Sequence, residues 1–126
     1  MDVSIQEISE RFSKSWSATL AHYEELINQP EFNHLIPLYL FIQKLSKAGE
    51  NKNFRLGTSM QDIIFSRSIE ADPELNKKYM KIKASDSSFV ITLKEGKKML
   101  REYTIKDLDD ERLRDLLQQL KDISID

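Results

Sequence analysis

Residues 79–106 read YMKIKASDSSFVITLKEGKKMLREYTIK, and this stretch decides the fold class. Apolar and polar side chains alternate along 80–84 and again along 89–93. Alternation with a period of two is typical of β-strands, because successive side chains point to opposite faces. The polar run 85–88 and Gly96 supply tight turns that lead into a third strand over 99–106. The stretch therefore predicts an antiparallel meander. The side chains expected on its apolar face are Met80, Ile82, Ala84, Phe89, Ile91 and Leu93.

Amphipathic segments on both sides of the meander predict helices. Apolar residues recur every three or four positions over 4–28, over 37–48 and after Asp109. We expect Ser4 and Asp109 to cap the first and last of these helices. The segment 37–48 is apolar around most of its girth, which indicates burial on several sides.

The segment between the second helix and the meander is harder to assign. Phe54 and Leu56 suggest a short strand, and Ser59 could cap a helical turn that leads into a further strand over 63–65. Asp72-Pro73-Glu74 predicts a loop. The order of elements predicts an α+β fold in a single domain, 1–126. This fold has two N-terminal helices, an antiparallel meander of three or four strands, and a C-terminal helix packed on one sheet face.

Composition indicates the class of protein and its cellular compartment. The chain has 126 residues, no cysteine, 40% apolar and 32% charged residues. These values are typical of a globular protein, and the lack of cysteine fits a reducing compartment. The first residues lack the pattern of a secretory signal, and no apolar run approaches the roughly 20 residues that span a bilayer. We expect a soluble cytoplasmic protein without a membrane partner.

Motifs for catalysis, metals and cofactors are missing from the sequence. His22 and His34 have no metal-ligand spacing, and the three glycines form no phosphate-binding loop. The carboxylate groups at 24–25, at 72 and 74, and at 109–111 fit helix ends and loops better than acid–base catalysis. We therefore expect a non-enzyme with no catalytic residue, no metal and no cofactor.

The charge of the chain is distributed unevenly. Residues 77–106 hold nine Lys/Arg and three Asp/Glu, a balance of +6, although the whole chain carries −2. Lys81, Lys83 and Lys94 should project together from the polar face of the meander, which also carries Tyr79, and Arg101 should lie at their rim. Arg101 shares a face with Met99, Tyr103 and Ile105, which suggests a strand near an edge of the sheet. The candidate partner-binding site consists of Tyr79, the three lysines and Arg101, and the predicted function is that of an adaptor, regulatory or immunity-type protein that binds another protein.

Nucleic-acid binding is an alternative function for the basic region. In a winged helix, residues 59–66 would be the recognition helix and residues 79–94 the wing. Gln61 and Arg67 are the candidate base-reading side chains of that segment.

Two further hypotheses concern the apolar residues. A small ligand could bind in a pocket lined by Trp16, Tyr39 and Phe41. The apolar girth of the second helix also suggests a homodimer. Its contact would involve Leu35, Tyr39, Phe41 and Ile42.

Overall fold

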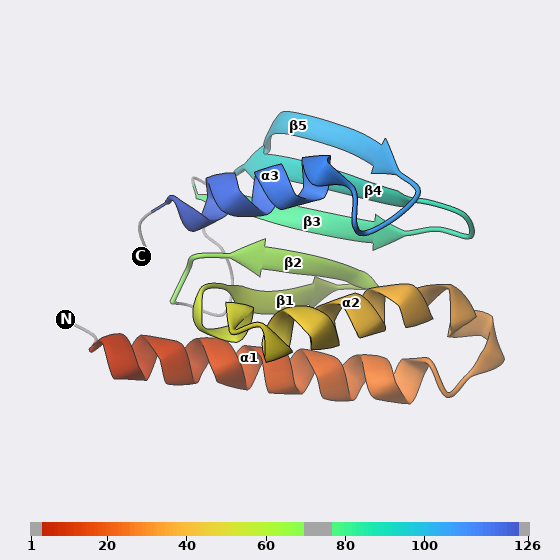
Figure 1. Ribbon diagram of the computed structural model, residues 1–126, viewed down its shortest axis with the longest axis horizontal. Helices are drawn as coiled ribbons and strands as arrows, with labels where there is room; N and C mark the ends of the chain where they lie inside the picture. Colours follow the sequence, from red (N-terminus) through yellow and green to blue (C-terminus); the bar gives the residue numbers. More distant parts are fainter. Residues whose placement is uncertain (1–3, 70–76, 124–126) are drawn as a thin grey trace.

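The structure is a computed structural model that describes residues 4–69 and 77–123 (Figure 1). Within these residues, three α-helices pack on a five-stranded antiparallel sheet whose strands follow one another in chain order. The α+β class is confirmed, and the sheet has five strands rather than three or four. The loop predicted at Asp72-Pro73-Glu74 lies outside the described residues. The elements are α1 (Ile5–Leu26), η1 (Pro30–Leu35), α2 (Ile36–Lys47), η2 (Glu50–Lys52), β1 (Arg55–Ser59), β2 (Asp62–Ser66), β3 (Lys78–Ala84), β4 (Phe89–Glu95), β5 (Lys98–Ile105) and α3 (Glu111–Lys121).

The first two helices lie where the sequence predicts them. Ser4 caps α1, because its Oγ accepts a hydrogen bond from the N–H of Glu7 at 3.1 Å. α2 begins one residue earlier than predicted and has Pro37 in its first turn, where a missing N–H has no helical partner. Gly49 follows α2 with a φ of +91°, the left-handed conformation that commonly ends a helix.

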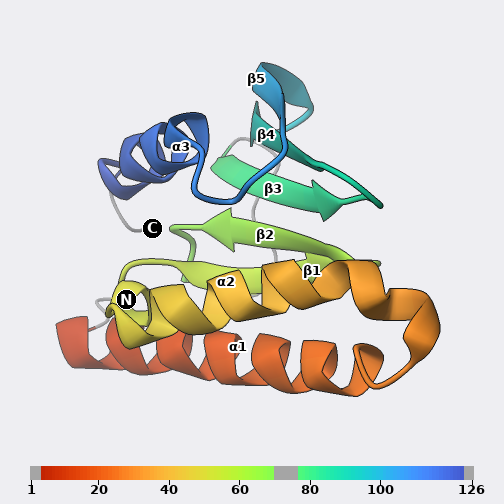
Figure 2. The same cartoon turned by 45° about the vertical axis from the view of Figure 1, so that its right-hand side comes forward.

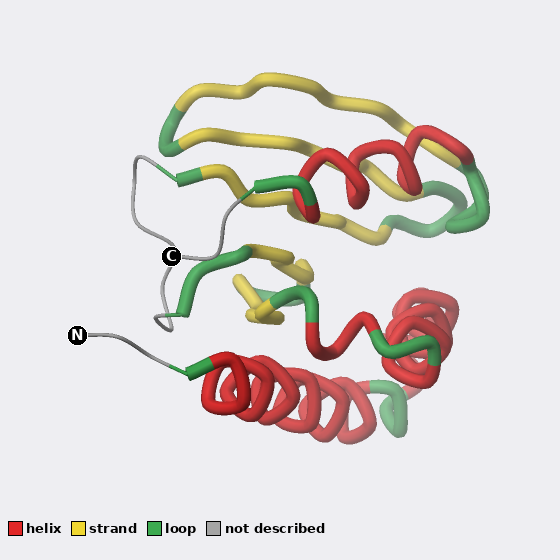
Figure 3. Tube along the Cα trace, turned by 60° about the vertical axis from the view of Figure 1, so that its left-hand side comes forward, coloured by secondary structure: helices red, strands yellow, loops and turns green. Residues whose placement is uncertain are grey.

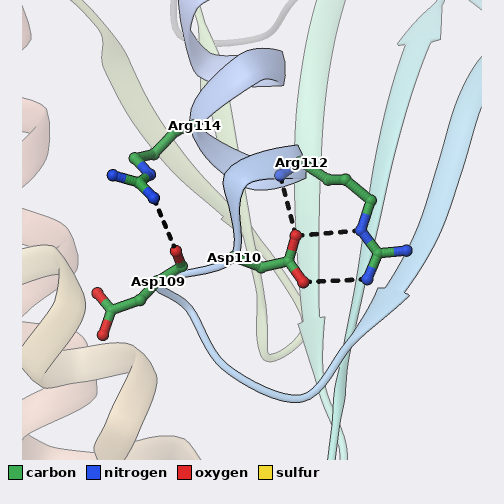
Figure 4. A network of polar contacts seen from close by, with 4 residues as sticks. All are labelled: Asp109, Asp110, Arg112 and Arg114. Carbon is green, nitrogen blue, oxygen red and sulfur yellow. Dashed lines mark hydrogen bonds and ion pairs between the residues drawn. The ribbon is translucent and has the colours of Figure 1, made fainter.

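The cap of α3 is Asp110 and not Asp109, so the helix begins one residue later than predicted (Figure 4). The Asp110 carboxylate accepts hydrogen bonds from the guanidinium of Arg112 at 3.0 Å and from the backbone N–H of Arg112 at 2.9 Å. These hydrogen bonds lower the pKa of Asp110 to about 2. The Asp109 backbone carbonyl instead accepts a hydrogen bond from Arg114 at 3.3 Å.

Residues 55–66 form a β-hairpin, so the helical turn predicted from Ser59 is wrong. Ser59 pairs with Asp62 across a two-residue turn in which Met60 has a φ of 59°. Packing overrides the local capping signal, because Phe65 makes edge-to-face contacts with Trp16 and Phe54. Their ring centroids lie 6.0 and 5.7 Å from that of Phe65. The recognition helix of the winged-helix alternative is therefore absent at 59–66.

The meander β3–β4–β5 is confirmed. Met80 pairs with Leu93 and Ile82 pairs with Ile91 across β3 and β4, so the predicted apolar side chains share one face. Gly96 makes the β4–β5 turn with a φ of 62°. A β-bulge interrupts the β4–β5 ladder between Leu93 and Lys94. Such a bulge shifts the register of the strand by one residue, and hence the face to which its side chains point.

The core lies on one face of the sheet, which α2 and α3 cover, while α1 runs along β1 (Figures 1 and 2). Trp16 of α1 is 1% exposed and donates a hydrogen bond from Nε1 to the Phe54 carbonyl at 2.8 Å. The four leucines of the α3 stripe are buried, as the helical period predicts: Leu113, Leu116, Leu117 and Leu120.

The apolar girth of α2 is covered within the chain only in part. Leu35 and Ile42 are at most 1% exposed, Tyr39 and Phe41 are half-buried, and Leu40 is 54% exposed. Two of the four residues expected at a homodimer contact therefore lie in the core and cannot reach a second molecule. Self-association through other residues stays a prediction.

Candidate functional site

Four of the five candidate site residues lie together on the sheet face opposite the core. Tyr79, Lys81 and Lys83 alternate with the buried residues of β3, and Lys94 of β4 is the direct cross-strand partner of Tyr79. Cross-strand partners share a face, so the alternation of the sequence places these four side chains correctly. No helix of the described residues covers this face (Figure 2). We call these four residues the basic face.

Lys81 is the least available charge of the basic face. Its Nζ lies 3.7 Å from Oδ2 of Asp62, and the two side chains are 33% and 19% exposed. Asp62 begins β2, and the sequence predicts a strand only over 63–65 and not its pairing with β3, so this partner could not be anticipated. The Asp62 charge also adds to the effect of burial in raising the pKa of Tyr23.

Arg101 points away from the basic face. It is the cross-strand partner of Leu93, whose side chain belongs to the core face, and Arg101 stays exposed because β5 is the edge of the sheet. Its Nη1 donates a hydrogen bond to the Leu100 carbonyl at 3.2 Å. Arg101 therefore shares a face with Tyr103 and Ile105, as the alternation predicts, and lies at the rim of the lysines rather than among them. Met99 is the residue that the bulge moves to the other face, where it pairs with Lys94.

The positive charge continues around the β4–β5 turn. Lys97 and Lys98 are exposed there, next to Lys94 and Arg101. Within the part of the chain that the structure describes, none of these four cations lies within 4.0 Å of a carboxylate oxygen. A group of cations that form no ion pair within the protein is available to attract an acidic molecule.

The other chemical candidates have structural roles. His22 is exposed and contacts the Tyr23 ring edge to face at 5.8 Å. Arg67 donates hydrogen bonds from Nε to the Ile123 carbonyl at 2.9 Å and from Nη1 to the Asn53 carbonyl at 2.6 Å. Among the described residues, no three His, Asp or Glu side chains are arranged to hold a metal ion.

A cleft that sequence reasoning missed lies at the other end of the sheet. It has a volume of about 570 Å³ and opens between the start of α2, the β3–β4 turn and the β5–α3 loop. Of the three residues predicted to line a ligand pocket, only Phe41 lines it; Trp16 lies in the core, and the Tyr39 hydroxyl accepts a hydrogen bond from Gln43. The cleft joins three segments distant in sequence, so no local pattern could reveal it. Its charged lining residues are His34, Lys44, Asp86, Lys106, Asp107 and Asp109.

Comparison of this chain with protein-family models, with curated proteins and with solved structures found no match. None of the helices described in the structure combines the length and the apolar character that crossing a bilayer requires.

Proposed function

We propose that this protein is a non-catalytic binding protein, of an adaptor or regulatory kind, whose partner is an acidic surface of another protein. The observation that carries the proposal is the cluster of lysines without ion-pair partners on the basic face and at the β4–β5 turn. Lys83 and Lys94, with Lys97 and Lys98, have no carboxylate within 4.0 Å among the described residues. Complementary charge of this kind speeds association and selects partners.

Several observations favour a protein over nucleic acid. Residues 59–66 belong to the hairpin 55–66 and provide no helix that could enter a groove. Arg67 donates hydrogen bonds to two backbone carbonyls of its own chain. Tyr79 is the aromatic side chain of the basic face, and it is half-buried beside Lys94. A single half-buried ring is a poor platform for stacking successive bases.

The test reverses charge where no internal ion pair is lost. The variant combines Lys83→Glu, Lys94→Glu and Lys97→Glu. Lys81 is left unchanged because its replacement would remove the ion pair with Asp62. We expect the variant to remain folded by circular dichroism, because Lys83 and Lys97 are exposed and the half-buried Lys94 makes no ion pair; surface substitutions of this kind usually change stability by about 0.5 kcal/mol or less each. It should no longer capture the protein that the wild type captures from an extract of the source cell.

The matched control makes the same change of charge away from the basic face. Lys14, Lys47 and Lys52 are exposed on α1, α2 and η2, and their change to glutamate should leave capture intact. Equal capture by wild type and both triple variants would refute the proposal. Capture that nuclease treatment abolishes would refute it in favour of nucleic acid. In that case the affinity should also fall steeply with salt.

A further inference from the structure

The two edges of the sheet, β1 and β5, differ in the hydrogen-bond partners of their backbone groups. At the β1 edge, α1 supplies side-chain partners for the backbone. Ser15 Oγ accepts a hydrogen bond from the Leu56 N–H at 3.0 Å, and Tyr23 donates one to the Gln61 carbonyl at the β1–β2 turn. With the bond from Trp16 to Phe54 just before the strand, these contacts close this edge to a further strand.

The β5 edge is open. Within residues 4–69 and 77–123, β5 (Lys98–Ile105) pairs with β4 alone, and it is the outermost strand in Figures 1 and 3. An antiparallel neighbour uses the N–H and C=O groups of every other residue, so about half of those in β5 point outward. Among the described residues, the one hydrogen bond given to a β5 backbone group outside the sheet ladder is that from the Arg101 guanidinium to the Leu100 carbonyl. The edge therefore offers a row of backbone donors and acceptors.

The side chains along this edge indicate which strand it would accept. β5 itself holds Lys98, Arg101 and Glu102, and with the flanking Lys97 and Lys106 residues 97–106 hold four Lys/Arg and one Glu, a balance of +3. Met99, at 53% exposure, adds an apolar contact beside Lys98. A second copy of β5 would bring two strands of the same net charge together, whereas an acidic strand would be attracted.

The bulge limits the length of edge that can be used. The β4–β5 ladder is regular from the pair Phe89–Ile105 to the pair Leu93–Arg101 and is interrupted beyond it. A bulge disrupts regular pairing locally, so an added strand can align with Arg101–Ile105 and project its acidic end toward Lys97 and Lys98. We infer that the acidic partner docks as an extended strand along the outer edge of β5, over residues 101–105. This inference rests on the proposed function.

The experiment uses a defined probe. An eight-residue peptide of alternating Glu and Val is titrated into the isotope-labelled protein, and backbone amide shifts are followed by nuclear magnetic resonance. We expect the shifts to map to residues 98–105. The corresponding peptide of alternating Lys and Val should produce none at the same concentration, because it is repelled by the edge.

Two further peptides test strand addition itself. Each carries N-methyl groups on alternate residues of the acidic peptide, one on the odd and one on the even positions. Only every other N–H of an added strand faces the edge, so one version should lose binding and the other should keep it. Equal effects of the two versions would overturn the inference.

A charge-reversal variant completes the design. Lys98→Glu combined with Arg101→Glu should weaken binding of the acidic peptide about tenfold, since two favourable contacts become repulsive. The Lys14→Glu and Lys47→Glu pair should not weaken it. Shifts confined to Tyr79, Lys81 and Lys83 would refute docking at the edge while leaving the proposed function standing, and acidic peptides that cause no shift anywhere would refute both.

Discussion

Replacing Trp16 by phenylalanine tests how α1 is held on the sheet. The change removes the hydrogen bond from Nε1 to the Phe54 carbonyl and leaves that carbonyl without its indole partner, at a cost of about 1–3 kcal/mol. The smaller ring also gives up apolar contact in a fully buried site beside Phe65, which adds about 1 kcal/mol. We expect the free energy of unfolding to fall by about 2–4 kcal/mol in total.

Urea unfolding followed by circular dichroism measures this loss, because the variant has no tryptophan left for fluorescence. Ile5→Ala is the matched control on the same helix. Its side chain is 85% exposed, and we expect a change of about 0.5 kcal/mol or less. If Trp16→Phe unfolded at the same urea concentration as the wild type with the same slope, the anchoring role of the indole would be refuted.

Three further predictions concern α3 and its ends. Leu116→Asp places a carboxylate among buried leucines and should lower the free energy of unfolding by about 4 kcal/mol or more, so circular dichroism should show a largely unfolded protein. Gln119→Asp, on the exposed face of the same helix, should fold normally. The pKa of Asp110 is lowered in the folded protein, so its contribution to stability is present above the ordinary carboxyl pKa and is lost as pH falls toward 2. Between pH 5 and pH 2 the thermal midpoint of Asp110→Asn should therefore fall less than that of the wild type. Equal falls of the two midpoints would contradict this. Arg67→Met removes two hydrogen bonds that join β2 to the ends of α3 and η2, and urea unfolding should show a loss of about 2–3 kcal/mol; a loss within error of zero would show that these bonds are replaced by water.

Periodic patterns in the sequence predict the parts of the fold whose elements are long. α1, α2, α3 and the meander were each predictable because a period of 3.6 or 2 persists over enough residues to identify the element. The hairpin β1–β2 could not be predicted in the same way, because its apolar run 63–65 is too short to distinguish a helical period from a strand period. Its structure depends on Trp16, which packs on Phe65 from a helix nearly 50 residues earlier in the chain.

The candidate site, like the fold, could be predicted from the sequence only in part. Alternation alone places Tyr79, Lys81 and Lys83 on one face, and the turn at 85–88 brings Lys94 beside them. Alternation also places Arg101 with Tyr103 and Ile105, and this cation among apolar residues indicates a strand near an edge, which the strand order confirms. Met99 could not be placed, because one extra residue at the bulge reverses the face to which its side chain points.

The hydrogen bonds between α1 and the β1 hairpin have a consequence for the folding pathway. They join residues 38 to 41 positions apart, whereas every strand of the sheet pairs with its neighbour in the chain. Closing a loop of that length costs more chain entropy than closing a hairpin turn, so the meander can form in the transition state before α1 docks. Substitutions at the α1 contacts should then act mainly by accelerating unfolding, and substitutions between β3 and β4 mainly by slowing folding. The lifetime of the folded protein would therefore be governed by its first helix.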